Sequence, residues 1–249
     1  MSYTQSEIVS QTSDLTSSIY IFSSATDSTY ANDPYCRVLD LMGRGWVYRG
    51  AGGDAYAYVL SGGTICRGII EYPGRLYASA GATVTDMTID GHTYICDPGA
   101  ATGTARADIT LNHVRDKGNV EFVLRGSNVK AYDIAVQGKK TAIQNGAYVE
   151  GLHISGGTAT MEFNTGTVVD SNASAMIGSN FNVSAGALNV SAGAGKTINI
   201  YGLNANAGAA VTIGHNVLAH LQSGNVANDV YTSNGYLLVS AGAQLRGIN

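Results

Sequence analysis

A short glycine turn recurs along this 249-residue chain, each time between a polar step and an apolar stretch. Between the turns lie segments of about four to six residues rich in Val, Ile, Thr and Tyr, such as residues 84–89. Segments of this kind are typical of short strands, and glycine supplies the positive φ that β-branched residues avoid. A repeat this short predicts a coiled ladder of strands. Its expected structural turns are Gly63, Gly81, Gly157, Gly186 and Gly242.

The turn spacing predicts the size of one coil. Gly63, Gly81 and Gly99 are separated by two steps of eighteen residues, which is enough for two strands and their turns. We therefore expect an all-β fold, a single-stranded right-handed parallel β-helix (β-solenoid), in which residues 46–249 form roughly ten rungs. At ~4.8 Å per rung the body would be a rod about 45 to 50 Å long. Residues 1–45 have few glycines and many Ser and Thr, which indicates an N-terminal capping segment with one or two strands.

Charge is scarce in this chain. The formal net charge is -4, and charged residues make up 13% of the chain, about half the usual share. No basic stripe is present, so nucleic acid is not an expected partner. Between Ser171 and Asn249 the charged side chains are Lys196, Asp229 and Arg246. Such a surface suits secreted, stacked β proteins.

The cysteines and the amino end leave the compartment open. Cys36, Cys66 and Cys96 are thirty residues apart, so a coil of that period would bring two of them together as a disulfide, whereas buried thiols are the simpler interpretation. No signal peptide is visible, because the first basic residue is Arg37. No segment approaches the ~20 apolar residues of a membrane span, so membrane insertion is not expected.

Two stretches resemble a known family. They are Val59-Leu60-Ser61-Gly62-Gly63-Thr64-Ile65 and Gly74-Arg75-Leu76-Tyr77-Ala78-Ser79-Ala80-Gly81-Ala82-Thr83. This pattern resembles the repeats of AIDA-type self-associating autotransporter passengers, clearly over residues 55–91 and loosely over 140–249. The resemblance implies a right-handed β-helical rod that acts in aggregation, adhesion or biofilm, with heptose on Ser or Thr in some members. It also implies an extracellular or bacterial cell-surface location.

An enzymatic interpretation depends on the charged segment 104–117. Its candidate residues are Asp108, His113, Arg115, Asp116 and Lys117, with Asp86, Asp90 and Asp97 upstream. None of them lies in a recognisable catalytic motif, and a solvated loop of mixed charge is the simpler interpretation. The histidines are scattered without a metal-ligand spacing. We therefore expect no catalytic, metal-binding or cofactor-binding residues, whereas a groove lined by carboxylates of adjacent rungs would favour a polysaccharide-binding or polysaccharide-cleaving module.

Tyrosine is the enriched aromatic residue, with fifteen copies. Tyr48, Tyr56, Tyr58, Tyr72 and Tyr77 are candidate contact residues, for sugar rings or for an adhesive stripe. The competing interpretation is a ladder of rings that stiffens the coil.

The expected function is structural and non-enzymatic: an adhesive surface rod that self-associates through its lateral faces or its rung ends. The chain stops at residue 249 without a polar capping segment, which suggests either a fragment or a filament subunit that stacks end to end. Surface glycans are a further class of partner. The alternative function is the polysaccharide module, of the tail-fibre or lyase type.

Overall fold

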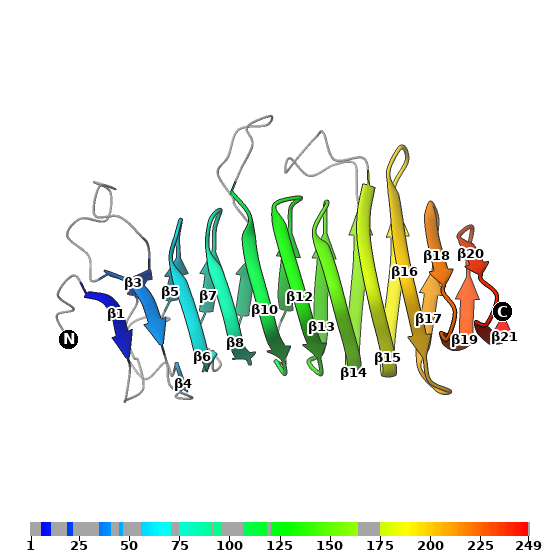
Figure 1. Ribbon diagram of the computed structural model, residues 1–249, viewed down its shortest axis with the longest axis horizontal. Coiled ribbons are helices and arrows are strands. Elements are labelled where there is room, and N and C mark those ends of the chain that lie inside the picture. The colour runs from blue at the N-terminus through cyan, green and yellow to red at the C-terminus, as the bar shows by residue number, and fades with distance from the viewer. Residues whose placement is uncertain are drawn as a thin grey trace.

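The computed structural model is an all-β solenoid of parallel strands, coiled into about eight turns of about nineteen residues each. It describes residues 6–10, 19–21, 35–40, 45–46, 56–70, 75–90, 92–95, 107–118, 121–163 and 175–248. Figure 1 shows an elongated rod in which the strands stack side by side, with β1 near one end of the rod and β21 near the other. The predicted β-helical fold is confirmed, with fewer turns than the ten expected.

The strands form two parallel ladders that run the length of the rod. The first ladder contains β1 (Ser6–Ser10), β3 (Tyr35–Asp40), β6 (Thr64–Ile70), β8 (Thr83–Ile89), β10 (Ile109–Asp116), β12 (Val129–Val136), the first parts of β14 (Tyr148–Phe163) and β15 (Ala175–Ala192), β16 (Thr197–Ala205), β18 (Val217–Leu221) and β20 (Tyr236–Val239). The second ladder contains β2 (Ile19–Ile21), β5 (Tyr56–Val59), β7 (Arg75–Ala78), β9 (His92–Ile95), β11 (Glu121–Arg125), β13 (Lys140–Gln144), the later parts of β14 and β15, β17 (Ala210–Ile213), β19 (Val226–Thr232) and β21 (Gln244–Ile248). The two-residue strand β4 (Gly45–Trp46) pairs with β6.

Turn length explains the smaller number of turns. Thr64 pairs with Thr83, nineteen residues on. In contrast, Thr83 pairs with Thr110 and Val149 pairs with Gly178, which are 27 and 29 residues on. These two turns accommodate insertions, and a uniform spacing of eighteen to twenty residues overlooks them.

The expected capping segment contributes strands to the same ladders. β1 pairs in parallel with β3, and β2 pairs in parallel with β5. Strand pairing thus continues across the predicted boundary at residue 45, since β3 pairs with β6. The other residues of segment 1–45 lie outside the described part of the chain. The role of this segment as a cap therefore stays a prediction.

The core is a stack of apolar side chains that repeats from turn to turn. In β8 the buried residues are Val84, Met87 and Ile89, so the pattern is apolar-x-x-apolar-x-apolar. Burial of one such side chain stabilises the fold by about 1.5–3 kcal/mol. The same three positions are buried in the long strands of the first ladder, so the core is continuous along the rod. Single positions in it are occupied by Gly68 of β6, Asp116 of β10 and Gly178 of β15.

Four of the five predicted turn glycines adopt the expected backbone. The φ angles of Gly81, Gly157, Gly186 and Gly242 are 83°, 62°, 82° and 83°. At the predicted turn of Gly63 the positive φ of 72° belongs to Gly62, while Gly63 is buried and its amide donates to the Leu60 carbonyl to close the turn.

A bend inside the long strands turns the chain from one face of the rod to the next. The residue directly before the second apolar position has a left-handed backbone, with φ near 50° at Asp86, His113 and Asp133. The parallel register places these residues directly above one another. We call this line the corner column. It consists of Arg67, Asp86, His113, Asp133, Gly151, Asn180 and Gly202, all with positive φ.

Candidate functional site: a carboxylate–imidazole ladder

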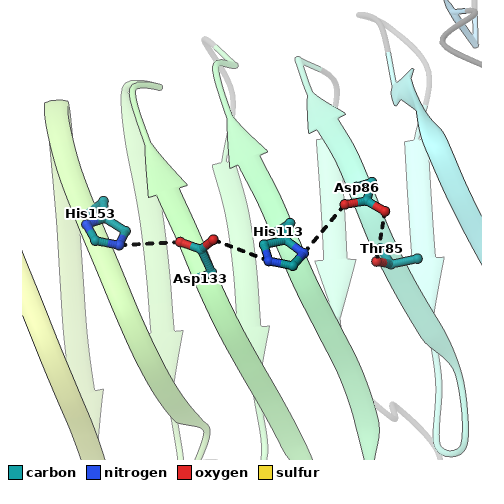
Figure 2. Close-up of polar contacts among 5 residues, drawn as sticks. All are labelled: Thr85, Asp86, His113, Asp133 and His153. Carbon is teal, nitrogen blue, oxygen red and sulfur yellow. Dashed lines mark hydrogen bonds and ion pairs between the residues drawn. The ribbon is translucent and has the colours of Figure 1, made fainter.

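Acidic and imidazole side chains alternate along the corner column (Figure 2). The Nδ1 atom of His113 lies 3.5 Å from Oδ1 of Asp86, and its Nε2 atom lies 3.5 Å from Oδ2 of Asp133. The other oxygen of Asp133 lies 3.3 Å from Nε2 of His153. The hydroxyl of Thr85 donates to Asp86 at 3.4 Å. Four turns of the rod are thus joined by a line of opposite charges wherever the imidazoles are protonated.

The backbone of the corner explains this alignment. A left-handed residue at the same position of each turn projects its side chain at the same angle, and successive turns are ~4.8 Å apart. Asn, Asp and His are the side chains that most often accept this conformation outside glycine. Gly151 follows Asp133 in the column and has no side chain, so His153, two residues further along β14, is the group that reaches Asp133.

A groove of about 370 Å³ runs beside the ladder across β8, β10 and β12. Its polar lining comprises Asp86, Thr88, His113, Arg115 and Asp133. Asp86 and Asp133 are two turns apart, or about 9.6 Å along the rod. Carboxylates of adjacent rungs are expected in a polysaccharide-binding or polysaccharide-cleaving helix, whereas the two carboxylates of this groove lie on alternate turns with His113 between them.

The hydrogen-bonding capacity of His113 favours a structural role for the ladder. An imidazolium has two N–H donors and serves two carboxylates at once, whereas a neutral imidazole has one donor. Both carboxylates face an imidazole nitrogen of His113 and not each other. The side chains of the ladder are 49–64% exposed, so each pair contributes about 0–1 kcal/mol. In the described part of the chain, no three His, Cys, Asp or Glu residues form a group that would hold a metal ion.

Asp116 contradicts the prediction that segment 104–117 is a solvated loop. The segment forms β10 from Ile109 onward, and Asp116 occupies the interior position that Ile89 and Val136 hold in neighbouring turns. Its exposure is 1%. The carboxylate accepts a hydrogen bond of 2.6 Å from the Thr141 hydroxyl and one of 3.0 Å from the Gly118 amide.

This environment changes the acidity of Asp116. Burial raises the pKa of its carboxyl from 3.8 to about 6, although the hydrogen bonds from Thr141 and Gly118 lower it. The neighbouring charge of Asp90 raises the pKa further. Asp116 is thus a buried acid that ties β10 to β13 and has no access to the groove.

The other candidate residues of the charged segment do not form one site. Arg115 lines the groove, whereas Asp108 and Lys117 are exposed at the two ends of β10. Asp90 follows β8, and Asp97 lies outside the described residues.

The structure supports the ladder interpretation for two of the five candidate tyrosines. Tyr58 and Tyr77 are half-buried and stack on each other, with ring centroids 5.5 Å apart and an interplanar angle of 19°. Tyr48 and Tyr72 lie outside the described residues, and Tyr56 belongs to β5, where its side chain is not described.

The predicted cysteine alignment is not found at Cys66. This residue is a thiol and pairs in register with Asp40, whereas Cys36, on the same strand β3, pairs with Ser6. The spacing of thirty residues is therefore not the period of the coil. Cys96 lies outside the described residues.

Sequence reasoning missed Asp133, His153 and Thr141. A signal for Asp133 was available, because Val84-x-x-Met87 aligns with Leu111-x-x-Val114 and Ala131-x-x-Ile134, and the residue before the second apolar position is then Asp86, His113 and Asp133. In the next turn this alignment places Gly151, and not His153, at this position. The same alignment places Asp116 with the core residues. No feature of residues 140–144 distinguishes Thr141 from an outward-facing threonine.

Comparisons with known proteins gave no relatives. No protein-family model, no curated protein and no solved structure matches the chain. Among the described residues, no helix is long and apolar enough to span a membrane.

Proposed function

We propose that the chain is a structural, non-enzymatic β-solenoid of the bacterial cell surface that associates with further copies of itself. The observation that carries this proposal is the sparsely charged surface of residues 175–248, which exposes seven large apolar side chains. The turn formed by β20 and β21 adds to it. Among the described residues, β20 pairs only with β18 and β21 only with β19. A strand edge of this kind is a template for a further strand, which can come from the same chain or from another copy.

The inward-facing residues of this turn are also uncovered. Leu237 and Val239 lie over Ala219 and Leu221, and Ile248 lies over Val230. Val239 is 41% exposed and Ile248 59% exposed, although their counterparts one turn below are buried. A further parallel turn would cover both the apolar side chains and the strand edges. Where that turn belongs to another copy, the contact is heterologous, and repeated contacts of this kind build a filament if they do not close into a ring.

The surface of the surrounding part of the rod favours contact over solvation. In the described part of the chain, seven of the eight exposed large apolar side chains follow Ala175. Only Lys196, Asp229 and Arg246 carry charge between Ser171 and the end of the chain. Weak contacts repeated along a rod or a filament would act together through avidity.

The alternative is a polysaccharide-binding or polysaccharide-cleaving module, and the groove beside the ladder favours it. Its test is the double variant Asp86→Asn/Asp133→Asn, assayed for turnover of neutral and acidic polysaccharides against the unmodified chain. A polysaccharide whose cleavage needs both carboxylates would establish the enzyme and contradict the structural role. We place self-association first because both carboxylates already face imidazole nitrogens.

Sedimentation velocity from about 1 to 100 μM tests self-association. The unmodified chain is expected to form longer species as its concentration rises, and Val239→Lys is expected to abolish them, because a charge would be buried in each junction. Ile177→Lys is the matched control, since Ile177 is also 41% exposed but lies away from the open turn. Monodisperse 25.8 kDa particles at every concentration would refute the proposal.

A further inference from the structure

A line of exposed rings and aliphatic side chains follows the outer face of the first ladder from β12 to β20. Two outward columns form it, two residues apart in each strand. The first column is Lys130, Tyr148, Ile177, Asn199, Leu218 and Tyr236. The second column is Tyr132, Glu150, Ser179, Tyr201, His220 and Leu238. We call these twelve residues the aromatic stripe.

The rings of the stripe are held in place by contacts between neighbouring turns. Tyr132 and Tyr148 have ring centroids 5.9 Å apart with a tilt of 59°, and Tyr201 meets the His220 ring edge-on at 6.2 Å. His220 is in turn hydrogen-bonded to Ser240 at 2.7 Å. Yet Tyr132 and Tyr201 are each 36% exposed. A ring that is both fixed and exposed loses little side-chain entropy when a ligand stacks on it.

The two ionic groups of the stripe are already engaged within the chain. The Lys130 ammonium donates to the Ser127 carbonyl at 2.9 Å, and the Glu150 carboxylate accepts from the Tyr148 hydroxyl at 2.9 Å. They also have opposite signs, so the stripe carries no net charge. A charged partner would gain little here, and an uncharged partner is favoured.

The dimensions of the stripe limit the kind of partner. The six residues of each column are separated by five steps of ~4.8 Å, a length of about 24 Å, and the columns are only about 7 Å apart. The contact area is then a few hundred Å², well below the roughly 800 Å² that each partner buries in a stable protein complex. A narrow ligand that lies along the rod fits this area, and a globular partner does not.

We propose that the aromatic stripe binds an uncharged linear polysaccharide that runs parallel to the rod axis. A pyranose ring has an apolar C–H face and a rim of hydroxyl groups, and tyrosine offers an apolar ring with a polar tip. Tyr132 and Tyr201 lie in one column three turns apart, at about 14 Å, so one extended chain contacts both rings. Glu150 and Ser179 lie between them in this column, and Asn199 lies beside Tyr201 in the first column. The serine and the asparagine supply hydroxyl and amide partners for the sugar hydroxyls.

Calorimetric titration with neutral hexasaccharides of glucose, mannose, galactose and xylose tests this site. At least one is expected to bind with one site per chain, and its trisaccharide is expected to bind at least tenfold more weakly because it cannot span both tyrosines. Tyr132→Ala and Tyr201→Ala are each expected to lower the affinity about tenfold, while Tyr201→Phe keeps most of it. Circular dichroism checks that each variant is folded.

Tyr231→Ala is the matched control. Tyr231 is 50% exposed but lies in β19 of the second ladder, off the stripe, so its loss should leave the affinity unchanged. Absence of binding by all four hexasaccharides would overturn the proposal, as would equal weakening in Tyr231→Ala. Tighter binding of a hexagalacturonate, or loss of binding only in Asp86→Asn, would also overturn it. Dimerisation lost in Tyr201→Ala, without saccharide binding, would assign the stripe to a second copy instead.

Discussion

Replacing Asp116 by asparagine tests whether one charge inside the rod makes the stability of the whole solenoid depend on pH. Asp116 is 1% exposed in a column whose neighbouring members are Ile89 and Val136. Its oxygens accept hydrogen bonds from the Thr141 hydroxyl and the Gly118 amide. Asparagine keeps the shape of the side chain, and its carbonyl can still accept one of these bonds.

The magnitude follows from the pKa of Asp116, which burial raises from 3.8 to about 6. A difference of about two pH units corresponds to about 3 kcal/mol. Because the folded-state pKa is the higher one, the folded chain holds the proton more tightly. This contribution to stability is complete below about pH 4 and is lost as the pH rises through about 6. Wild type therefore loses about 3 kcal/mol between pH 4 and pH 7, a loss that Asp116→Asn does not share.

Urea unfolding at half-unit intervals from pH 4 to pH 7 measures the effect. The informative quantity is the difference in unfolding free energy between variant and wild type, since the other carboxylates titrate equally in both. This difference should shift by about 3 kcal/mol in favour of the variant over that range. Asp108→Asn, at an exposed position beside the same strand, should show a shift below about 0.5 kcal/mol. A difference for Asp116→Asn that does not change with pH would refute the reasoning.

Three further substitutions probe the same region and the ladder. Gly138→Ala should destabilise the fold by about 2–3 kcal/mol in urea unfolding, because its Cβ would lie 2.6 Å from an Asp116 oxygen and 2.5 Å from a backbone carbonyl. Gly156→Ala, with its nearest atom at 3.4 Å, should cost under 1 kcal/mol, and equal costs would contradict the contact. Thr141→Val should cost about 2 kcal/mol at pH 7 and less at pH 4.5, where Asp116 is protonated in the folded state; a cost that is the same at both values would exclude the charge-assisted bond. His113→Glu should lower the melting temperature at low salt, because three carboxylates then lie side by side, and added NaCl should restore the melting temperature by screening them. An effect that does not depend on salt would point to backbone strain instead.

The coil was predictable from the sequence because its signals are local. A turn such as residues 61–64 shows its glycines and the strand that follows within a few residues, and so does the turn at residues 240–243. The number of turns was overestimated because insertions in two of them, such as the one between Thr83 and Thr110, carry no repeat.

The candidate site was less predictable because it depends on register. The bend in the long strands replaces simple alternation by the spacing apolar-x-x-apolar-x-apolar, so an alternating pattern assigns side chains after the bend to the wrong face. Asp116 was expected in solvent because segment 104–117 was interpreted as a loop of mixed charge, whereas its spacing from Leu111 and Val114 is that of Ile89 from Val84 and Met87. The ladder required one more step, because His153 reaches Asp133 only where Gly151 leaves the corner without a side chain.

At the left-handed corner, the backbone conformation stays the same whichever side chain the residue presents to the surface. The bend at Arg67, Asp86, His113 and Asp133 has nearly the same φ, although the four side chains differ in charge and size. Substitutions among residues that tolerate this backbone, such as Asp, Asn, His and Gly, would alter the surface and leave the core unchanged. The corner is therefore a row of sites at ~4.8 Å intervals where surface side chains can change in evolution, or be replaced by designed groups, without a change in the fold.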